Sequence, residues 1–148
     1  MSDTIIIRKA GKTDYESLMA LYNLFVGEDR YLKHTFDSFN SVLTNSSNRI
    51  FVAEKNSNLI GFATVSFRRV VRYPKAIAEL DELFVKEEHR KIGVGKLLLN
   101  AVIHESKKRD CYRIYIESAY EHKSAHIFYE GNRFKNNGFH FYKNLQTT

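Results

Sequence analysis

The sequence predicts an α/β fold organised as a single domain over residues 1–148, and three observations lead to this prediction. Strand-like apolar runs alternate with segments of helical periodicity. A strand–helix–strand crossover lies in the middle of the chain. The 148 residues, of which 43% are hydrophobic and 14% aromatic, suffice for one packed core and exclude a largely disordered chain.

The first half is expected to form one strand, two helices and a hairpin. Residues 5–8 are a β-branched run typical of a strand. Apolar side chains recur at helical intervals between positions 18 and 25 and again within 35–43. The apolar runs 49–54 and 59–67 flank a polar turn, which indicates a hairpin.

The second half is expected to contain the crossover. Residues 77–85 predict a strand, and the helix that starts at Gly93 has one apolar face and ends in cations that suit a helix C-terminus. Alternating side chains over 112–117 indicate the next strand. A short helix over 124–132 and a last strand over 139–142 complete the predicted order.

The chain carries 23 Lys and Arg against 17 Asp and Glu, a net charge of +6 that points to an anionic partner. Arg68, Arg69, Arg72 and Lys75 lie in one short stretch that contains no acid. We expect this stretch to be a solvated loop. Binding of RNA or another polyanion is the alternative, so nucleic acid is not the expected partner.

The composition also indicates where the protein is located and whether it binds a metal. The lone cysteine, Cys111, cannot form an internal disulfide, and no apolar run is long enough to span a bilayer. We therefore expect a cytoplasmic protein with no membrane partner. His122 and His126 have the spacing of a metal pair, but no carboxylate–histidine set accompanies them, so no metal is expected.

The strongest candidate site is a glycine-containing loop between the strand 77–85 and the helix that follows. The loop combines two glycines, three cations and the start of a helix: Arg90, Lys91, Ile92, Gly93, Val94, Gly95 and Lys96. Glycine lets the backbone approach a ligand closely, and the amides and dipole of a helix N-terminus attract anions. A pyrophosphate group fits this chemistry, although neither common phosphate-binding motif is present. A tight strand-to-helix turn without a ligand is the alternative.

This Arg-x-x-Gly-x-Gly loop after Leu-Phe-Val resembles the GNAT superfamily of acyl-CoA-dependent N-acetyltransferases. The run from Ser124 to Glu130, followed by Asn137-Gly138-Phe139, is similar to a second motif of that family, A-x-x-(F/L)-Y-E … G-F; Arg133-Phe134 could instead stand for the Gly-Phe pair. The resemblance covers nearly the whole chain. It implies the GNAT fold, a mixed central β-sheet of about six to seven strands flanked by about four helices.

The resemblance also implies roles for individual residues. The loop from Arg90 to Lys96 would bind the pyrophosphate of coenzyme A, and Leu83, Phe84 and Val85 would pair with its pantetheine arm, with Phe128 also at the cofactor. A backbone N–H near Leu83 would polarise the thioester carbonyl. Tyr129 matches the tyrosine that protonates the departing thiolate; a core aromatic is its alternative role.

Glu79, Asp81 and Glu82 are the candidates for the general base, with an ordered water chain as the alternative. Strict alternation places Glu79 and Asp81 on one face of the strand and Glu82 on the other. In family members a bulge is common here and would change that arrangement. Solvent-facing charges paired with nearby arginines are the alternative role for these acids.

The resemblance implies an N-acetyltransferase that transfers acetyl from acetyl-CoA, its co-substrate, to a primary amine by direct attack in a ternary complex. The expected partner is a small-molecule amine, whether a diamine, an amino-acid-like compound or an aminoglycoside, and a homodimer is a further expectation. Protein N-termini or lysines are alternative acceptors. A non-catalytic module that binds coenzyme A or RNA is the alternative from another class.

Overall fold

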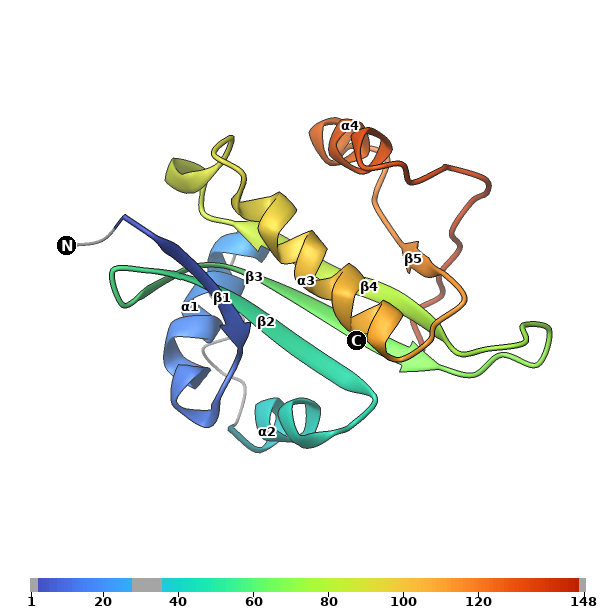
Figure 1. Ribbon diagram of the computed structural model, residues 1–148, viewed down its shortest axis with the longest axis horizontal. Coiled ribbons are helices and arrows are strands. Elements are labelled where there is room, and N and C mark those ends of the chain that lie inside the picture. Colours follow the sequence, from blue (N-terminus) through green and yellow to red (C-terminus); the bar gives the residue numbers. More distant parts are fainter. Residues whose placement is uncertain (1–2, 28–35, 147–148) are drawn as a thin grey trace. The chain divides into compact units, whose positions relative to one another are not determined.

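The computed structural model describes residues 3–27 and 36–146, in two compact units that divide after Tyr115. The first unit holds most of the secondary structure, and the second holds one helix (Figure 1). In chain order the elements are β1 (Ile5–Lys9), η1 (Lys12–Asp14), α1 (Tyr15–Val26), α2 (Phe36–Thr44), β2 (Asn48–Lys55), β3 (Asn58–Arg68), β4 (Ile77–Val85), η3 (Glu87–His89), α3 (Val94–Lys108), β5 (Ile114–Ile116) and α4 (Lys123–Gly131). Thr35, expected to start the second helix, lies outside the described residues.

The described strands form one sheet in the order β1-β2-β3-β4-β5, with antiparallel pairing from β1 to β4. The β5 side joins β4 through the Tyr112 N–H to Ala76 O bond (2.7 Å) and the Ala78 N–H to Arg113 O bond (3.0 Å). Residue numbers on the two sides rise together, as in a parallel pair, so the sheet is mixed.

The expectation of six to seven strands is corrected to five among the described residues. Residues 139–142 form no strand, and their aromatic side chains are exposed, with Phe139 at 76% and Phe141 at 87%. Alternating hydrophobicity produces a strand only where a neighbouring strand completes the hydrogen bonds. The expected strand over 112–117 is also shorter, since β5 covers only Ile114–Ile116.

Two layers of helix cover the sheet of the first unit (Figure 1). α1 and α2 pack on one face, where Leu18 and Phe39 meet Ile50 and Phe62 in the main buried cluster. α3 covers the other face and buries Leu98, with other apolar residues of its inner side. Each sheet face therefore has an apolar cover, which explains the nearly continuous burial along β3.

A buried carboxylate holds α3 against β2. Glu105 is 6% exposed, and its Oε1 atom lies 3.3 Å from the Nε atoms of both Arg49 and Arg109. Burial alone would raise the pKa of Glu105, but the hydrogen bond from Arg109 and the nearby cations lower it below its usual value. The contact therefore anchors the C-terminal part of α3 to β2.

The pairing of β3 with β4 contains a β-bulge at Asp81. Thr64 pairs with Glu82 and Val65 with Leu80, so Asp81 is an extra residue with no partner on β3. Further along, Gly61 pairs with Val85, and a Cβ atom on Gly61 would lie 2.7 Å from the Phe84 carbonyl oxygen. Only glycine permits the two backbones to lie this close.

In the second unit, α4 ends at Gly131 and Arg133 adopts a left-handed conformation with φ of 69°. The Phe134 N–H then donates to the Tyr129 carbonyl at 3.0 Å, and the Phe134 ring lies 6.0 Å from the Tyr129 ring. Arg133 therefore has the conformation typical of glycine at a helix end, and Phe134 makes the aromatic contact there, as expected if Arg133-Phe134 stands for the Gly-Phe pair of the motif. Gly138 lies in irregular chain.

We predict that Arg133→Gly stabilises the protein. A non-glycine residue in the left-handed region destabilises the folded state by roughly 1–2 kcal/mol, and glycine removes this strain. Because glycine also loses more backbone entropy on folding, we expect the net gain in unfolding free energy to be about 0.5–1 kcal/mol. Urea unfolding at neutral pH measures the change. Lys135→Gly, two residues on and without a positive φ, is the control and should be neutral or destabilising; equal gains in both variants would contradict the prediction.

Candidate functional site

The bulge separates the three acids of β4 into two environments. Asp81 and Glu82, although adjacent, both line a pocket of about 390 Å³ between the β3–β4 pair and the helices α1 and α2. Glu79 does not line it; its Oε1 atom lies 3.7 Å from the Arg68 guanidinium. Of the two arrangements considered for these acids, the bulged strand is the one observed and strict alternation does not hold, because the extra residue restarts the alternation at Asp81.

Glu82 is held in place by hydroxyl groups from two other elements. The Tyr22 hydroxyl of α1 donates to Glu82 Oε1 at 2.6 Å, and the Thr64 hydroxyl of β3 donates to the same atom at 2.7 Å. Two donors on one carboxylate oxygen restrict the rotamer of the Glu82 side chain. The carboxyl group of Glu82 is therefore held in a defined position at the pocket wall.

Asp81 has the most perturbed carboxyl group of the pocket. Desolvation by the surrounding protein raises its pKa to about 6, a hydrogen bond from Ser66 opposes this shift, and the neighbouring charges of Glu79 and Glu82 add to it. More than a third of the residue's surface remains exposed, so the group is both partly desolvated and accessible. A carboxylate with these properties suits proton transfer near neutral pH.

The rest of the pocket wall is largely apolar. The apolar lining residues come from α1, α2, β2 and β3: Leu18, Met19, Phe39, Val42, Ile50 and Val65. Sequence reasoning did not identify Tyr22 or Thr64 as part of the site. Tyr22 lies within the helical pattern of positions 18–25, and no local pattern indicates that its hydroxyl reaches an acid 60 positions away.

The glycine loop has the backbone geometry expected of an anion site. Lys91 and Gly93 both have positive φ, 64° and 93°, and Gly93 is the residue from which α3 begins. The first N–H groups of a helix have no partner within it and point outward from its start. Ile92 is 57% exposed and Lys96 is also exposed, whereas Val94 is buried and anchors the turn in the core.

Arg90 has a different environment from the one expected for a phosphate-binding cation. Its Nε atom donates to the Val85 carbonyl at 2.8 Å, and its guanidinium lies 5.6 Å from the centroid of the Phe84 ring. The side chain thus braces the end of β4 against the loop. This end of β4 is held by two sets of contacts. Its backbone pairs with β3 at Leu83, Phe84 and Val85, and the Arg90 side chain of the loop binds the Val85 carbonyl.

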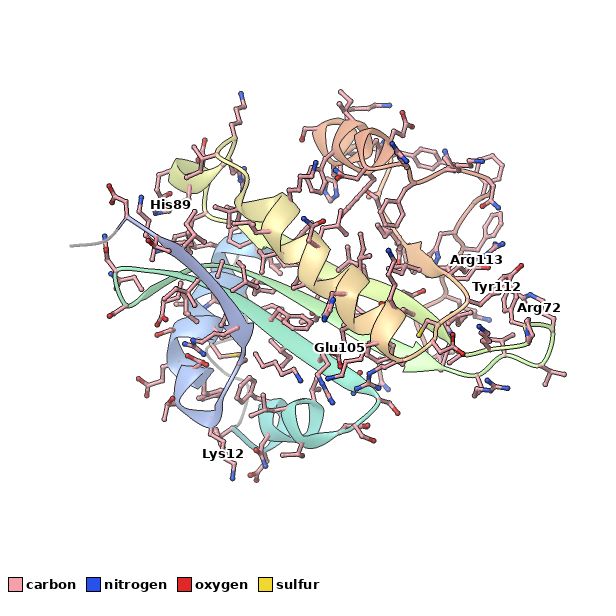
Figure 2. All side chains as sticks on the ribbon, viewed as in Figure 1. Lys12, Arg72, His89, Glu105, Tyr112 and Arg113 are labelled. Carbon is pink, nitrogen blue, oxygen red and sulfur yellow. The ribbon has the colours of Figure 1, made fainter. Side chains whose placement is uncertain are left out.

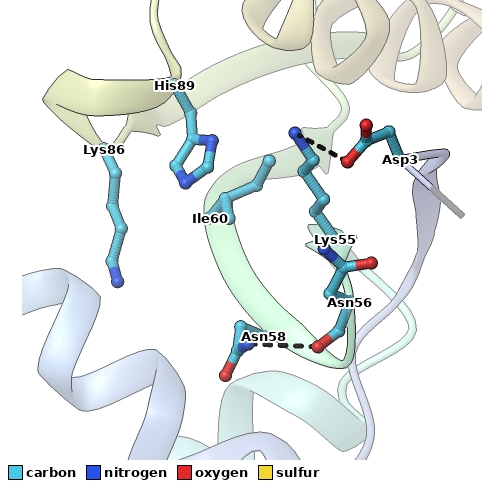
Figure 3. Close-up of a pocket in the computed structure, with 7 residues that line it drawn as sticks. All are labelled: Asp3, Lys55, Asn56, Asn58, Ile60, Lys86 and His89. Atoms are coloured by element: carbon cyan, nitrogen blue, oxygen red, sulfur yellow. Dashed lines mark hydrogen bonds and ion pairs between the residues drawn. The ribbon is translucent and has the colours of Figure 1, made fainter. Parts of the chain in front are cut away.

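A second pocket, of about 320 Å³, lies beside the same end of β4 (Figure 3). His89 and Lys55 lie on either side of Ile60, and Lys86 also lines the pocket. Lys55 Nζ is 3.7 Å from Asp3 Oδ1. Sequence reasoning missed this pocket, which adds positive charge near the base of the glycine loop.

Tyr129 and Phe128 lie on α4, in the second unit. Their rings are 5.6 Å apart, and neither residue is fully buried. Burial raises the pKa of Tyr129 above its ordinary value, so the phenol stays protonated at neutral pH. A protonated phenol is a competent proton donor to a thiolate.

The described residues contain no group of three or more His, Cys, Asp or Glu side chains that could hold a metal ion. His126 instead makes a 2.9 Å hydrogen bond between Nε2 and the Ala119 carbonyl, a local structural contact. In the part of the chain that the structure covers, no helix is sufficiently long and apolar to cross a membrane.

Comparison with known proteins gives a family match. The model of the acetyltransferase (GNAT) family matches residues 15–134. An uncharacterised N-acetyltransferase of Methanocaldococcus jannaschii is 29% identical over 133 residues, which cover 86% of this chain and 59% of that protein. The chain thus spans a little over half the length of this curated relative.

Solved structures share the fold at low sequence identity. An aminoglycoside acetyltransferase from an uncultured soil metagenomic sample, in complex with trehalose, superimposes with a TM-score of 0.86 at 18% identity, covering 96% of this chain and 97% of that one. The aminoglycoside N-acetyltransferase AAC(6′)-Iy in complex with CoA has a TM-score of 0.83 at 21% identity, with coverage of 99% and 98%.

We predict that Asp81→Asn stabilises the fold at neutral pH. Because the folded-state pKa is raised, folding loses stability as the pH rises from the ordinary aspartate value through about 6, and the neutral amide avoids this loss. Thermal unfolding at pH 4 and pH 7.5 should show the variant gaining relative to wild type only at the higher pH. Asp3→Asn, at a side chain 91% exposed, is the control; a stability difference for Asp81→Asn that is independent of pH would contradict the prediction.

Proposed function

The chain belongs to the GNAT acetyltransferase family, and we propose that it is an acetyl-CoA-dependent N-acetyltransferase acting on a primary amine. The observation that carries the proposal is a carboxyl group with a pKa of about 6 in a pocket at the middle of β4, the strand that leads into the glycine loop. The family match includes residues of both units, which supports a single N-acetyltransferase domain over residues 1–148.

The residues of the loop fit coenzyme A. We assign the pyrophosphate to the loop amides of residues 90–96, with Lys91 and Lys96 supplying charge, because the positive φ of Gly93 opens the backbone at the start of α3. The backbone of Leu83, Phe84 and Val85 would pair with the pantetheine arm, and Phe128 would also contact it. When bound, acetyl-CoA supplies the thioester that donates the acetyl group.

Asp81 is proposed as the general base. Its carboxylate accepts a proton from the ammonium form of the acceptor, and the free amine then attacks the thioester carbonyl, with the N–H near Leu83 stabilising the oxyanion. The tetrahedral adduct collapses to the amide, and the C–S bond breaks as the Tyr129 phenol donates its proton to the departing thiolate. The second nitrogen proton, released as the amide forms, passes to the resulting phenolate, so Tyr129 ends the reaction protonated. Glu82, held by Tyr22 and Thr64, would orient the cation. We place Glu79 outside the role of base because its carboxylate lies 3.7 Å from the Arg68 guanidinium and does not line the pocket.

The pocket favours a small primary amine with an apolar body. Two carboxylates attract the ammonium group, and the apolar residues of α1, α2, β2 and β3 surround the remainder. The aminoglycoside acetyltransferases among the structural neighbours support an amine acceptor. Protein N-termini or lysines are the second candidate acceptors, because a side chain or terminus also presents one amine. A module that only binds coenzyme A is the alternative from another class.

An amine panel tests the activity. Purified protein is incubated with acetyl-CoA and each of several monoamines, diamines, amino acids, aminoglycosides and peptides, and release of free thiol is followed. Saturable acetyl-CoA binding without amine-dependent thiol release would favour the non-catalytic module. Failure to bind coenzyme A at all would overturn the proposed function.

With the best acceptor, we predict that kcat/KM falls as the pH drops below about 6, because protonated Asp81 cannot accept a proton. Asp81→Asn should lower kcat by roughly 10²–10⁴-fold and remove this limb of the profile. Glu82→Gln is the comparison and should mainly raise KM for the amine. If Glu82→Gln removes the limb and Asp81→Asn does not, Glu82 is the base.

We also predict that Tyr129→Phe lowers kcat by about 10²–10⁴-fold with little change in acetyl-CoA affinity, because the phenol acts only in the reaction step. Steady-state kinetics and calorimetric titration with acetyl-CoA separate the two quantities. Tyr120→Phe, at a residue 71% exposed on the same unit, serves as the control. Equal losses of kcat and affinity in Tyr129→Phe would assign the residue a structural role.

A further inference from the structure

A group of aromatic and cationic side chains lies at the N-terminal end of β4, away from the pocket and the glycine loop. Arg72 and Tyr73 come from the β3–β4 connection, and Tyr112, Arg113 and Tyr115 come from the segment that leads into and through the start of β5. These five residues are called the Tyr–Arg cluster below. Figure 2 shows Arg72, Tyr112 and Arg113 close together at one end of the first unit.

The rings and guanidinium groups of the Tyr–Arg cluster pack on one another. Tyr73 stacks on Tyr112 with centroids 5.2 Å apart and planes at 29°, and its hydroxyl is hydrogen-bonded to that of Tyr115. The Arg113 guanidinium lies 5.2 Å from the Tyr112 centroid and 5.5 Å from that of Tyr73, and Arg72 lies 4.8 Å from the Tyr73 centroid. These contacts place both cations beside the same group of rings.

The two arginines of this cluster carry charge that neighbouring acids do not neutralise. Of the other cations nearby, Arg68 pairs with Glu79 and Lys75 pairs with Asp110. Within the described ranges, neither Arg72 nor Arg113 forms an ion pair with a carboxylate. Arg113 Nη1 donates one hydrogen bond to the Tyr115 hydroxyl at 3.4 Å, and the hydroxyls of the cluster also accept from Arg72. A guanidinium carries five N–H donors, so each arginine keeps further donors for phosphate oxygens.

Aromatic and apolar surface accompanies this charge. Tyr112 is 48% exposed, and Val71, at the tip of the β3–β4 connection, is fully exposed. A half-exposed tyrosine ring beside arginines offers a stacking surface for a nucleobase. Tyr73 lies within the basic stretch 68–75 of the sequence. The fold brings Tyr112, Tyr115 and Arg113 to it from about 40 residues further along the chain.

We propose that the Tyr–Arg cluster binds single-stranded nucleic acid, with Arg72 and Arg113 contacting phosphates and a base stacking on Tyr112. A duplex offers phosphates but no unstacked base, and an acidic peptide offers carboxylates but no base, so the aromatic part of the surface favours the single strand. The nine residues of β4 span about 30 Å and separate this surface from the glycine loop. The proposal is independent of acetyl transfer.

Fluorescence anisotropy of a labelled single-stranded oligonucleotide of about 12 nucleotides, titrated with the full chain without acetyl-CoA, tests the proposal. We expect a Kd of about 10⁻⁶–10⁻⁴ M that weakens with salt. Arg72→Ala/Arg113→Ala should weaken binding about tenfold or more and reduce the salt slope by about two. The control Lys9→Ala/Lys12→Ala removes the same charge at the other end of the unit, where Figure 2 labels Lys12, and should change Kd less than about twofold.

Tyr112→Leu separates stacking from charge. Loss of one stacked base should weaken single-strand binding by roughly 5- to 150-fold, while circular dichroism confirms that the variant is folded. Absence of binding at low salt, or equal weakening by both double variants, would overturn the proposal. Equal affinity for a duplex or for polyglutamate, with no effect of Tyr112→Leu, would also overturn it and assign the surface to polyanions in general. None of these outcomes bears on the amine panel.

Discussion

One extra residue in β4 determines how the candidate site is arranged. Because Asp81 has no partner on β3, the side-chain alternation restarts there, and two adjacent carboxylates line the same pocket. In a regular strand Asp81 and Glu82 would point to opposite faces. The bulge also allows the two groups to differ: Glu82 is fixed by hydroxyls from α1 and β3, whereas Asp81 remains accessible and partly desolvated.

Three groups of functional residues lie along β4. The Tyr–Arg cluster lies at its start, the two pocket carboxylates lie at its middle, and the glycine loop follows its end. Positive charge at both ends and negative charge between them would draw anions to the ends and an ammonium group to the middle. The net charge of +6 therefore does not describe any one of these surfaces.

Local patterns in the sequence predicted much of this arrangement. The strand 77–85 has its expected bounds, and the glycine loop starts a helix as expected, because periodicity and glycine placement are properties of neighbouring residues. Contacts between distant segments could not be predicted in this way. The Tyr22 hydroxyl reaches Glu82 only after α1 packs on the sheet, and Tyr112 meets Tyr73 only once β5 joins β4. The strand expected at 139–142 failed for the related reason that pairing needs a partner.

Gly61 connects the buried core with the end of β4. The space beside it is limited by the carbonyl of Phe84, and Phe84 and Val85 lead directly into the glycine loop. Any side chain at position 61 would displace that backbone, not a flexible neighbour. Over evolutionary time, a residue that touches no ligand would then be retained as strictly as one that does, and substitutions at Gly61 would be accepted only together with a rebuilt β4–α3 connection.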